Sequence, residues 1–190
     1  AEKTLGSFTV FNPDSTGGLS IAETPCDEKS LPEGVRLQKD GDSLVFETEL
    51  PPCGVKGFKT VSGKIADSRP ESNCFRTDFY EADFSGPLPV IRTLNGADVF
   101  APDGFGEILF RRDIGSMWSE FPISPWFGAE KMKEEVKSIL SGDVFIQVVT
   151  EGKVLSSPAA DGGNDDYWGG FGSLSFRKEY RFYRHQDYFT

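Results

Sequence analysis

The chain has 190 residues, enough for one sizeable hydrophobic core, and we expect a single β-rich domain over residues 1–190. Seventeen Phe, five Tyr and three Trp indicate an aromatic core, while 21 Gly and 12 Pro are typical of short strands joined by many turns. The net charge of −10 argues against nucleic acid as a partner, because Lys and Arg must neutralise a phosphate backbone, and no run approaches the roughly 20 apolar residues of a transmembrane helix.

Strand-like segments follow one another along the chain. Alternating or β-branched runs predict strands at 7–11, 19–23, 34–38, 43–50, 57–66, 73–84, 88–94, 107–113, 143–150 and 152–157. Two intervening segments, KDGD at 39–42 and NGAD at 95–98, contain the Asp-Gly and Asn-Gly pairs that favour tight hairpin turns. These turns predict antiparallel pairing of the strands beside them.

One segment has helical spacing instead. Ser124 is suited to the N-cap, Pro125 to the first helical position and Gly142 to the left-handed stop. The apolar residues between them recur every three or four positions: Met132, Val136, Ile139 and Leu140. This pattern predicts an amphipathic α-helix from about 125 to 141.

The last strand-like segment is basic and alternates with period two. Its inward face would carry Leu174, Phe176, Tyr180 and Phe182. Residues 171–190 hold four Lys or Arg against two Asp or Glu, in an otherwise acidic chain. We predict that the outward residues Arg177, Arg181 and Tyr183 form part of a surface that docks a protein partner, since Arg and Tyr are favoured at interfaces. A solvated strand face is the alternative.

About ten strands and one helix, with no regular alternation of the two, define the fold class. The sequence predicts an all-β protein, either an antiparallel β-sandwich or a closed β-barrel, with one amphipathic helix packed against it.

The three cysteines bear on compartment. Cys26, Cys53 and Cys74 lie in turn-like settings, and three thiols permit one disulfide, which we predict between Cys26 and Cys53. The first residue printed is Ala, as after cleavage of a signal peptide. Together these features predict a soluble, extracytoplasmic protein, secreted or lumenal. Three free thiols in a reducing compartment are the alternative.

Several chemistries lack the residues they need. The only histidine, His185, follows the last predicted strand and has no second imidazole or Cys-x-x-Cys pair for a metal. No Gly-x-Ser-x-Gly nucleophile elbow occurs, and the glycine-rich segments match no phosphate-binding spacing. The acidic segment DGGNDD at 161–166 departs from the EF-hand pattern, and we interpret it as a solvated turn rather than a calcium loop. We therefore expect neither a metal nor a cofactor.

Carbohydrate chemistry is the best enzyme candidate. Carboxylate residues are close in sequence to aromatic residues on which a sugar ring could stack. The candidate sugar-binding cluster consists of Trp118, Glu120, Asp165, Asp166 and Trp168. The competing interpretation is that the Trp side chains anchor the core or an interface.

No set of catalytic residue types stands out, and basic charge is concentrated at one end of an acidic chain. We predict a non-enzymatic binding or structural protein, an accessory subunit that docks on a larger protein complex. Two alternatives remain open: a carbohydrate-binding or carbohydrate-active β-sandwich, and a β-barrel that binds a lipid or pigment.

Overall fold

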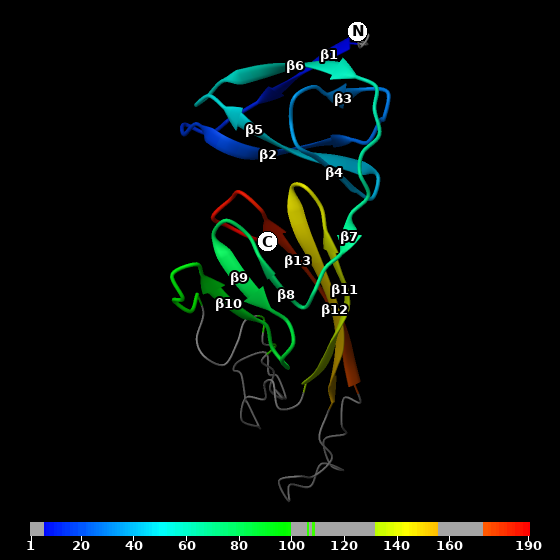
Figure 1. Ribbon diagram of the computed structural model, residues 1–190, viewed down its shortest axis with the longest axis vertical. Helices are drawn as coiled ribbons and strands as arrows, with labels where there is room; N and C mark the ends of the chain where they lie inside the picture. The colour runs from blue at the N-terminus through cyan, green and yellow to red at the C-terminus, as the bar shows by residue number, and fades with distance from the viewer. Residues whose placement is uncertain (1–5, 100–105, 107, 109–131, 156–172) are drawn as a thin grey trace, which may run out of the picture. The chain divides into compact units, whose positions relative to one another are not determined.

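The fold is all β. The computed structural model describes residues 6–99, 106, 108, 132–155 and 173–190 (Figure 1). These residues form thirteen strands in four antiparallel sheets, and none of them is helical. The all-β prediction is confirmed. Each sheet has two ends in its strand order, so the closed-barrel alternative is wrong for the described residues.

The strands have the following bounds. The first six are β1 (Gly6–Phe11), β2 (Gly18–Pro25), β3 (Leu31–Pro32), β4 (Leu37–Asp40), β5 (Ser43–Leu50) and β6 (Val55–Val61). The others are β7 (Arg69–Pro70), β8 (Cys74–Arg76), β9 (Tyr80–Asp83), β10 (Val90–Thr93), β11 (Met132–Ser141), β12 (Phe145–Leu155) and β13 (Ser173–Tyr183). The sheet orders are β1-β6-β3, β2-β5-β4, β10-β9-β8 and β13-β12-β11-β7.

The chain divides into two compact units that interleave in sequence. Unit 1 comprises Ala1–Glu71, Leu140–Gln147 and Arg181–Thr190. Unit 2 comprises Ser72–Ile139 and Val148–Tyr180. Strands β11, β12 and β13 each contribute residues to both units. The expectation of one domain over residues 1–190 stays a prediction.

The core of unit 1 is built on both faces of β5, which lies between β2 and β4 (Figure 1). On one face, Phe46 packs with Ala22 and with Phe58 of β6, whose ring lies 5.5 Å from that of Phe46. On the other face, Val45 packs in a second cluster with Val144, Phe145 and Tyr183. Consecutive residues of β5 are therefore buried, as expected of a strand covered on both sides.

Unit 2 also has an aromatic core. Phe84, which follows β9, stacks on Phe75 of β8 with ring centroids 5.9 Å apart. Its ring also lies 5.4 Å from that of Tyr180 on β13. Burial raises the pKa of Tyr180 above its ordinary value, and the nearby charge of Glu134 adds to the effect.

The predicted helix is wrong where the structure can be compared with it, since Met132–Ser141 is strand β11. Exposure alternates along its first half: Lys133, Glu135 and Lys137 are exposed, whereas the side chain of Glu134 is only 5% exposed. Glu134 tolerates burial because Lys178 of β13 forms an ion pair with it. A charged residue on the sheltered face hides the period-two pattern that marks a strand. Residues 125–131 of the predicted helix lie outside the described residues.

The predicted Cys26–Cys53 disulfide is wrong, because all three cysteines are unpaired in the structure. Cys26 follows the end of β2 where Pro25 lies opposite Ser43, and Cys53 lies beyond the other end of the pair, where Gly18 lies opposite Leu50. Eight residues of strand separate these ends by roughly 23 Å, whereas a disulfide spans at most about 7 Å between Cα atoms.

We expect three free thiols per chain when thiols are titrated under denaturing, non-reducing conditions. The strand pairing that separates Cys26 from Cys53 is the reason, and Cys74 has Ser85 as its side-chain neighbour at 3.7 Å. A count of one free thiol would contradict the unpaired state of the three cysteines in this structure. No described helix is long and apolar enough to cross a membrane.

Candidate functional site

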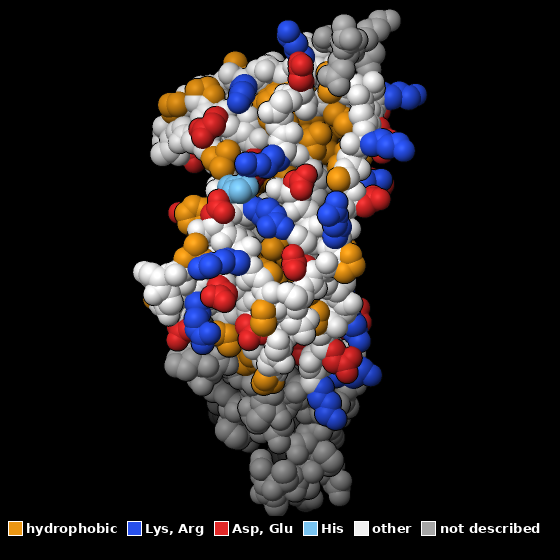
Figure 2. All heavy atoms as spheres, viewed as in Figure 1, with side chains coloured by type: hydrophobic (Ala, Val, Ile, Leu, Met, Phe, Trp, Pro, Cys, Tyr) orange, Lys and Arg blue, Asp and Glu red, His pale blue; other side chains and the backbone are white. Residues whose placement is uncertain are grey.

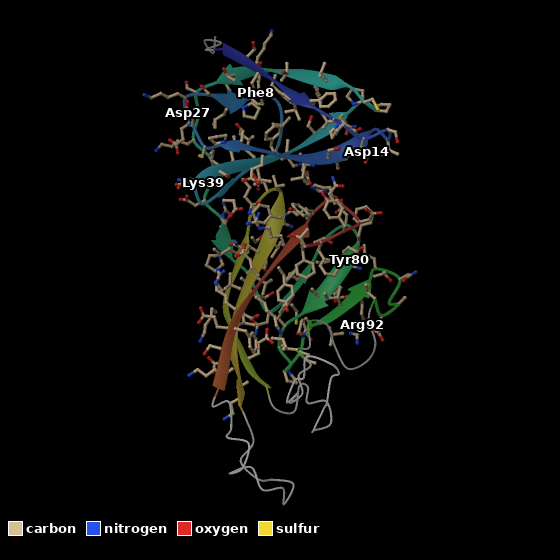
Figure 3. All side chains as sticks on the ribbon, turned by 180° about the vertical axis from the view of Figure 1, so that it is seen from behind. Phe8, Asp14, Asp27, Lys39, Tyr80 and Arg92 are labelled. Carbon is tan, nitrogen blue, oxygen red and sulfur yellow. The ribbon has the colours of Figure 1, made fainter. Side chains whose placement is uncertain are left out.

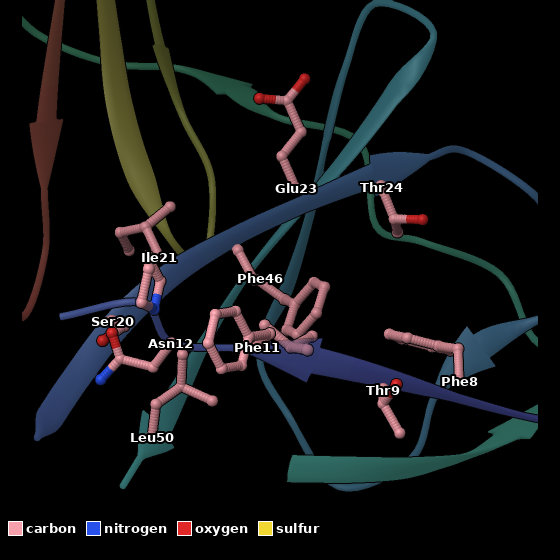
Figure 4. Close-up of a pocket in the computed structure, with 13 residues that line it drawn as sticks. Phe8, Thr9, Phe11, Asn12, Ser20, Ile21, Glu23, Thr24, Phe46 and Leu50 are labelled. Carbon is pink, nitrogen blue, oxygen red and sulfur yellow. The ribbon is translucent and has the colours of Figure 1, made fainter. Parts of the chain in front are cut away.

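A pocket of about 440 Å³ opens in unit 1 between β1 and β2 (Figure 4). It is lined by residues 8–13 and 20–24 together with Phe46 and Leu50, and we call it the edge slot. Residues 8–13 and residues 20–24 each line the slot without a gap. Neighbouring side chains on a strand point to opposite faces, so a slot on one face would be lined by every second residue only. The slot is therefore bounded by the edges of the two strands rather than by one face of a sheet. Both β1 and β2 are terminal in their strand orders.

The free edge of β1 directs unpaired peptide groups at the slot. The backbone N–H of Asn12 donates to the C=O of Gly54 at 2.8 Å, and Gly54 is also its partner opposite in the register. Hydrogen-bonded and non-hydrogen-bonded pairs alternate along an antiparallel ladder, so the N–H and C=O groups of Val10 and Phe8 also point toward β6. The N–H and C=O groups of Thr9 and Phe11 then point away from β6. They form no hydrogen bond with any described residue.

The same reasoning applies to β2. Cys26 donates its N–H to the C=O of Asp42, the residue that continues the antiparallel β2–β5 register beyond Pro25 and Ser43, at 2.8 Å. The peptide groups of the even-numbered residues of β2 therefore point toward β5. The peptide groups of Ile21 and Glu23 therefore point outward. The side chain of Gln186, donating to the outward C=O of Leu19 at 3.2 Å, agrees with this assignment. Two strand edges thus face one slot.

The side chains of the slot combine aromatic surface with a few polar groups. The rings of Phe8, Phe11 and Phe46 point into it (Figure 4), and those of Phe8 and Phe46 meet edge to face at 6.1 Å. Phe11 is 61% exposed, unusually high for a Phe beside a core. Glu23 is the one charged side chain among the lining residues. The slot can therefore hold an apolar group and one cationic neighbour.

Asn12 is buried and holds one end of the slot in place through its side-chain amide. Its amide nitrogen donates to the C=O groups of Thr16 and Pro51 at 2.8 and 2.9 Å. Its Oδ1 accepts from the backbone N–H of Asp14, which lies in the loop after β1 and away from Phe8 (Figure 3). These bonds join two loops, so this end of the slot is preorganised.

Reasoning from sequence missed the edge slot, but one signal was available. In the segment SFTVF, alternation places Phe11 on the same face as Ser7 and Thr9, the polar parity of β1. An aromatic residue on an outward face is a candidate contact residue.

The structure separates the three predicted interface residues. Arg177, in unit 2, is exposed and pairs with Glu179 at 3.2 Å. Arg181, in unit 1, pairs with Asp40 at 2.7 Å and stacks on Phe145 at 5.5 Å. Tyr183 is only 8% exposed, so the prediction that it points outward is wrong. The second cluster of unit 1 packs against β13 at this position and buries the side chain.

Arg177 lines a second, broad depression of about 750 Å³ on unit 2. Its charged side chains are Lys133, Lys137, Lys153, Arg177, Glu135 and Glu151. The four cations exceed the two anions by two. Figure 2 shows Lys and Arg side chains interspersed with Asp and Glu over the face in view. Lys137 is already paired with Glu135 at 3.0 Å. The depression thus has weaker chemical definition than the edge slot.

A buried polar cluster in unit 2 was also missed. Lys178 donates to Glu134 Oε2 and to the C=O of Gly106, both at 2.6 Å. The hydroxyl of Thr150 donates to the other oxygen of Glu134. Each member has a partner, so the cluster is a closed network.

The remaining predicted site residues lie outside the described residues: Trp118, Glu120, Asp165, Asp166 and Trp168. Within the described ranges, no group of three or more His, Cys, Asp or Glu is arranged to hold a metal ion.

Comparison with known proteins shows a shared fold. No family model and no curated protein matches the sequence. A structure of a protein in glycosyl hydrolase family 38 from Enterococcus faecalis is similar at 11% identity and a TM-score of 0.54, over 96% of this chain and 30% of its own. An alpha-mannosidase from Enterococcus faecalis V583 is similar at 12% identity and a TM-score of 0.57, over 95% of this chain and 28% of its own. This chain therefore spans less than a third of either protein.

Proposed function

We propose that this chain is a non-enzymatic accessory module that docks on a protein partner through the edge slot. The observation that supports the proposal is that the exposed ring of Phe11 lines the same slot as four residues whose peptide groups point outward. These four residues are Thr9, Phe11, Ile21 and Glu23. Exposed aromatic side chains beside a pocket are typical of the central residues of protein interfaces. The similarity to less than a third of two larger chains supports the interpretation that this fold acts as one module.

An extracytoplasmic location is part of the proposal, but it has lost one support. The sequence interpretation relied partly on a disulfide, and the three cysteines are unpaired in the structure. Arg177 is kept as a separate candidate contact on unit 2, because its side chain is exposed beside the depression of that unit.

A carbohydrate-binding module is the second candidate. Phe11 provides an apolar plate, and the carboxylate of Glu23 and the hydroxyls of Ser20 and Thr24 line the same slot. Sugars bind where aromatic faces and hydrogen-bonding groups converge. The two similar structures are of a family 38 glycosyl hydrolase and an alpha-mannosidase, so an α-mannoside is the natural probe.

The Phe11→Asp variant will lose at least about 30-fold in affinity for peptides selected on the wild-type chain. The test is to pan a random 12-residue peptide library on wild-type protein and measure binding of the selected peptides to both forms. Removing a central aromatic contact typically costs 2 kcal/mol or more, equivalent to this factor. Folding should survive within about 1 kcal/mol, since the side chain is mostly exposed.

Val55→Asp is the matched control. Val55 lies opposite Phe11 in the β1–β6 register and is 64% exposed, but it does not line the slot. It should bind the selected peptides like wild type. If no Phe11-dependent peptide is selected, protein docking at the slot is wrong. Loss of α-mannoside binding in Phe11→Asp, without peptide selection, would establish the second candidate.

A further inference from the structure

We propose that the ligand of the edge slot is an extended polypeptide segment, which adds to the free edge of β1 as a fourth strand of the β1-β6-β3 sheet. This inference rests on the proposed function and specifies how the partner is recognised. Strand addition is a known mode of peptide recognition, in which main-chain hydrogen bonds give affinity and alternate side chains give specificity.

The peptide groups of β1 define the chemistry of the ligand. Thr9 and Phe11 each direct one N–H and one C=O into the slot. A ligand that displaces water from this edge must supply matching donors and acceptors at every second residue, about 6.6 Å apart. An extended polypeptide has this spacing along its own edge.

The free edge of β1 is better suited to pairing than that of β2. On β2, the outward C=O of Leu19 already accepts the side chain of Gln186, and Pro25 stands at an outward position where it has no N–H to offer. On β1 no described group occupies the outward peptide groups of Thr9 and Phe11. Pro13 follows and limits the pairing to a short segment.

The lining side chains set the sequence of the segment. An added strand directs alternate side chains to the core side of the sheet, where Phe8 and Phe46 present aromatic surface. Its other side chains lie beside Thr9 and Phe11. Glu23 gives the slot a negative charge with no basic residue among the lining residues. We expect alternating apolar residues with a Lys or Arg near one end.

The experiment uses a peptide selected on the wild-type chain and two N-methylated forms of it, one methylated on the odd-numbered amides and the other on the even-numbered amides. Each form blocks one edge of the extended peptide. We expect one form to lose at least about tenfold in affinity and the other to bind like the parent. Equal binding by all three peptides, still abolished in Phe11→Asp, would overturn strand addition and leave docking at the slot intact.

The protein side has its own matched pair. Thr9→Pro removes an outward N–H while leaving the bonds of Phe8 and Val10 to β6, and proline is tolerated on edge strands. Thr9→Val keeps the N–H and removes only the hydroxyl. We expect loss of peptide binding in Thr9→Pro and retention in Thr9→Val. In wild type, the peptide should slow hydrogen exchange at the amides of Thr9 and Phe11.

Folding and self-association are controlled in the same experiment. Thermal unfolding shows whether Thr9→Pro is folded, and the two N-methylated peptides test the proposal on wild type if it is not. If wild type is a dimer that Thr9→Pro converts to a monomer, the ligand of the edge is a second copy of this chain. That result would overturn the proposal of a separate partner.

Discussion

Lys178→Met will lower the free energy of unfolding by about 3–5 kcal/mol. The side chains of Lys178 and Glu134 are only 15% and 5% exposed, and their ion pair at 2.6 Å joins β13 to β11 within unit 2. Methionine fills similar volume but leaves the carboxylate of Glu134 sheltered from water with the hydroxyl of Thr150 as its remaining partner. The cost is that of a buried charge without its counter-ion. Denaturant unfolding of wild type and variant measures it.

Two further variants make this result specific. Lys137→Met removes an ion pair within β11, but Lys137 and Glu135 are both well exposed to water, so the free energy of unfolding should hardly change. The double variant Lys178→Met with Glu134→Leu removes both charges and should recover most of the lost stability. If Lys178→Met costs no more than Lys137→Met, the Glu134–Lys178 pair is not buried as the structure has it.

Local chemistry predicted two turns of this fold, but it missed the turn between β8 and β9 and placed a break inside β12, which is continuous. The KDGD segment joins β4 to β5, and Gly41 has a positive φ of 57° in it. The NGAD segment turns the chain after β10, and Gly96 has a φ of 84°. Both turns depend on residues within four positions of each other, and a glycine supplies the left-handed backbone without steric cost. Such information is present in any short window of sequence.

Long-range pairing explains the errors. The apolar spacing predicts a helix where β11 lies, because Glu134 resembles a solvent-exposed charge unless its partner Lys178, 44 residues later in the chain, is known. The Cys26–Cys53 bridge failed because the register of β2 and β5 separates residues that both lie in turns. Neither the Glu134–Lys178 ion pair nor the register of β2 and β5 can be predicted from the residues next to them in the sequence.

The candidate site depended on the same missing information. Strands at 7–11 and 19–23 were predicted, and they correspond to β1 and β2. Whether a strand is central or at an edge depends on the sheet order, which single-strand patterns do not contain. The outward position of Phe11 could be predicted from alternation, but the unpaired peptide groups beside it could not.

Gln38→Leu will lower the free energy of unfolding by about 3–5 kcal/mol, because it leaves two buried N–H groups without an acceptor. Gln38 of β4 is 2% exposed, and its Oε1 accepts from the backbone N–H groups of Val144 and Phe145 at 3.0 and 2.8 Å. Leucine has similar size and restores neither bond. Ser68→Ala is the control: it removes the longer contact at 3.4 Å to Nε2 of Gln38 and should cost less than about 1 kcal/mol.

The same contact predicts why position 142 is glycine. A Cβ at Gly142 would lie 2.1 Å from the side-chain amide carbon of Gln38, so Gly142→Ala must displace the amide that satisfies both N–H groups. We expect Gly142→Ala to be strongly destabilising in wild type and much milder in the Gln38→Ala background, where the space is open. Residues in direct contact give such non-additive effects, and a double-mutant cycle by denaturant unfolding measures them. Additive costs would mean that the side chain of Gln38 does not fill the space beside Gly142. A coupling between the two positions would confirm that the amide of Gln38 occupies this space. Its role as acceptor is tested separately by Gln38→Leu, because leucine fills the same volume without supplying the oxygen that the N–H groups of Val144 and Phe145 need.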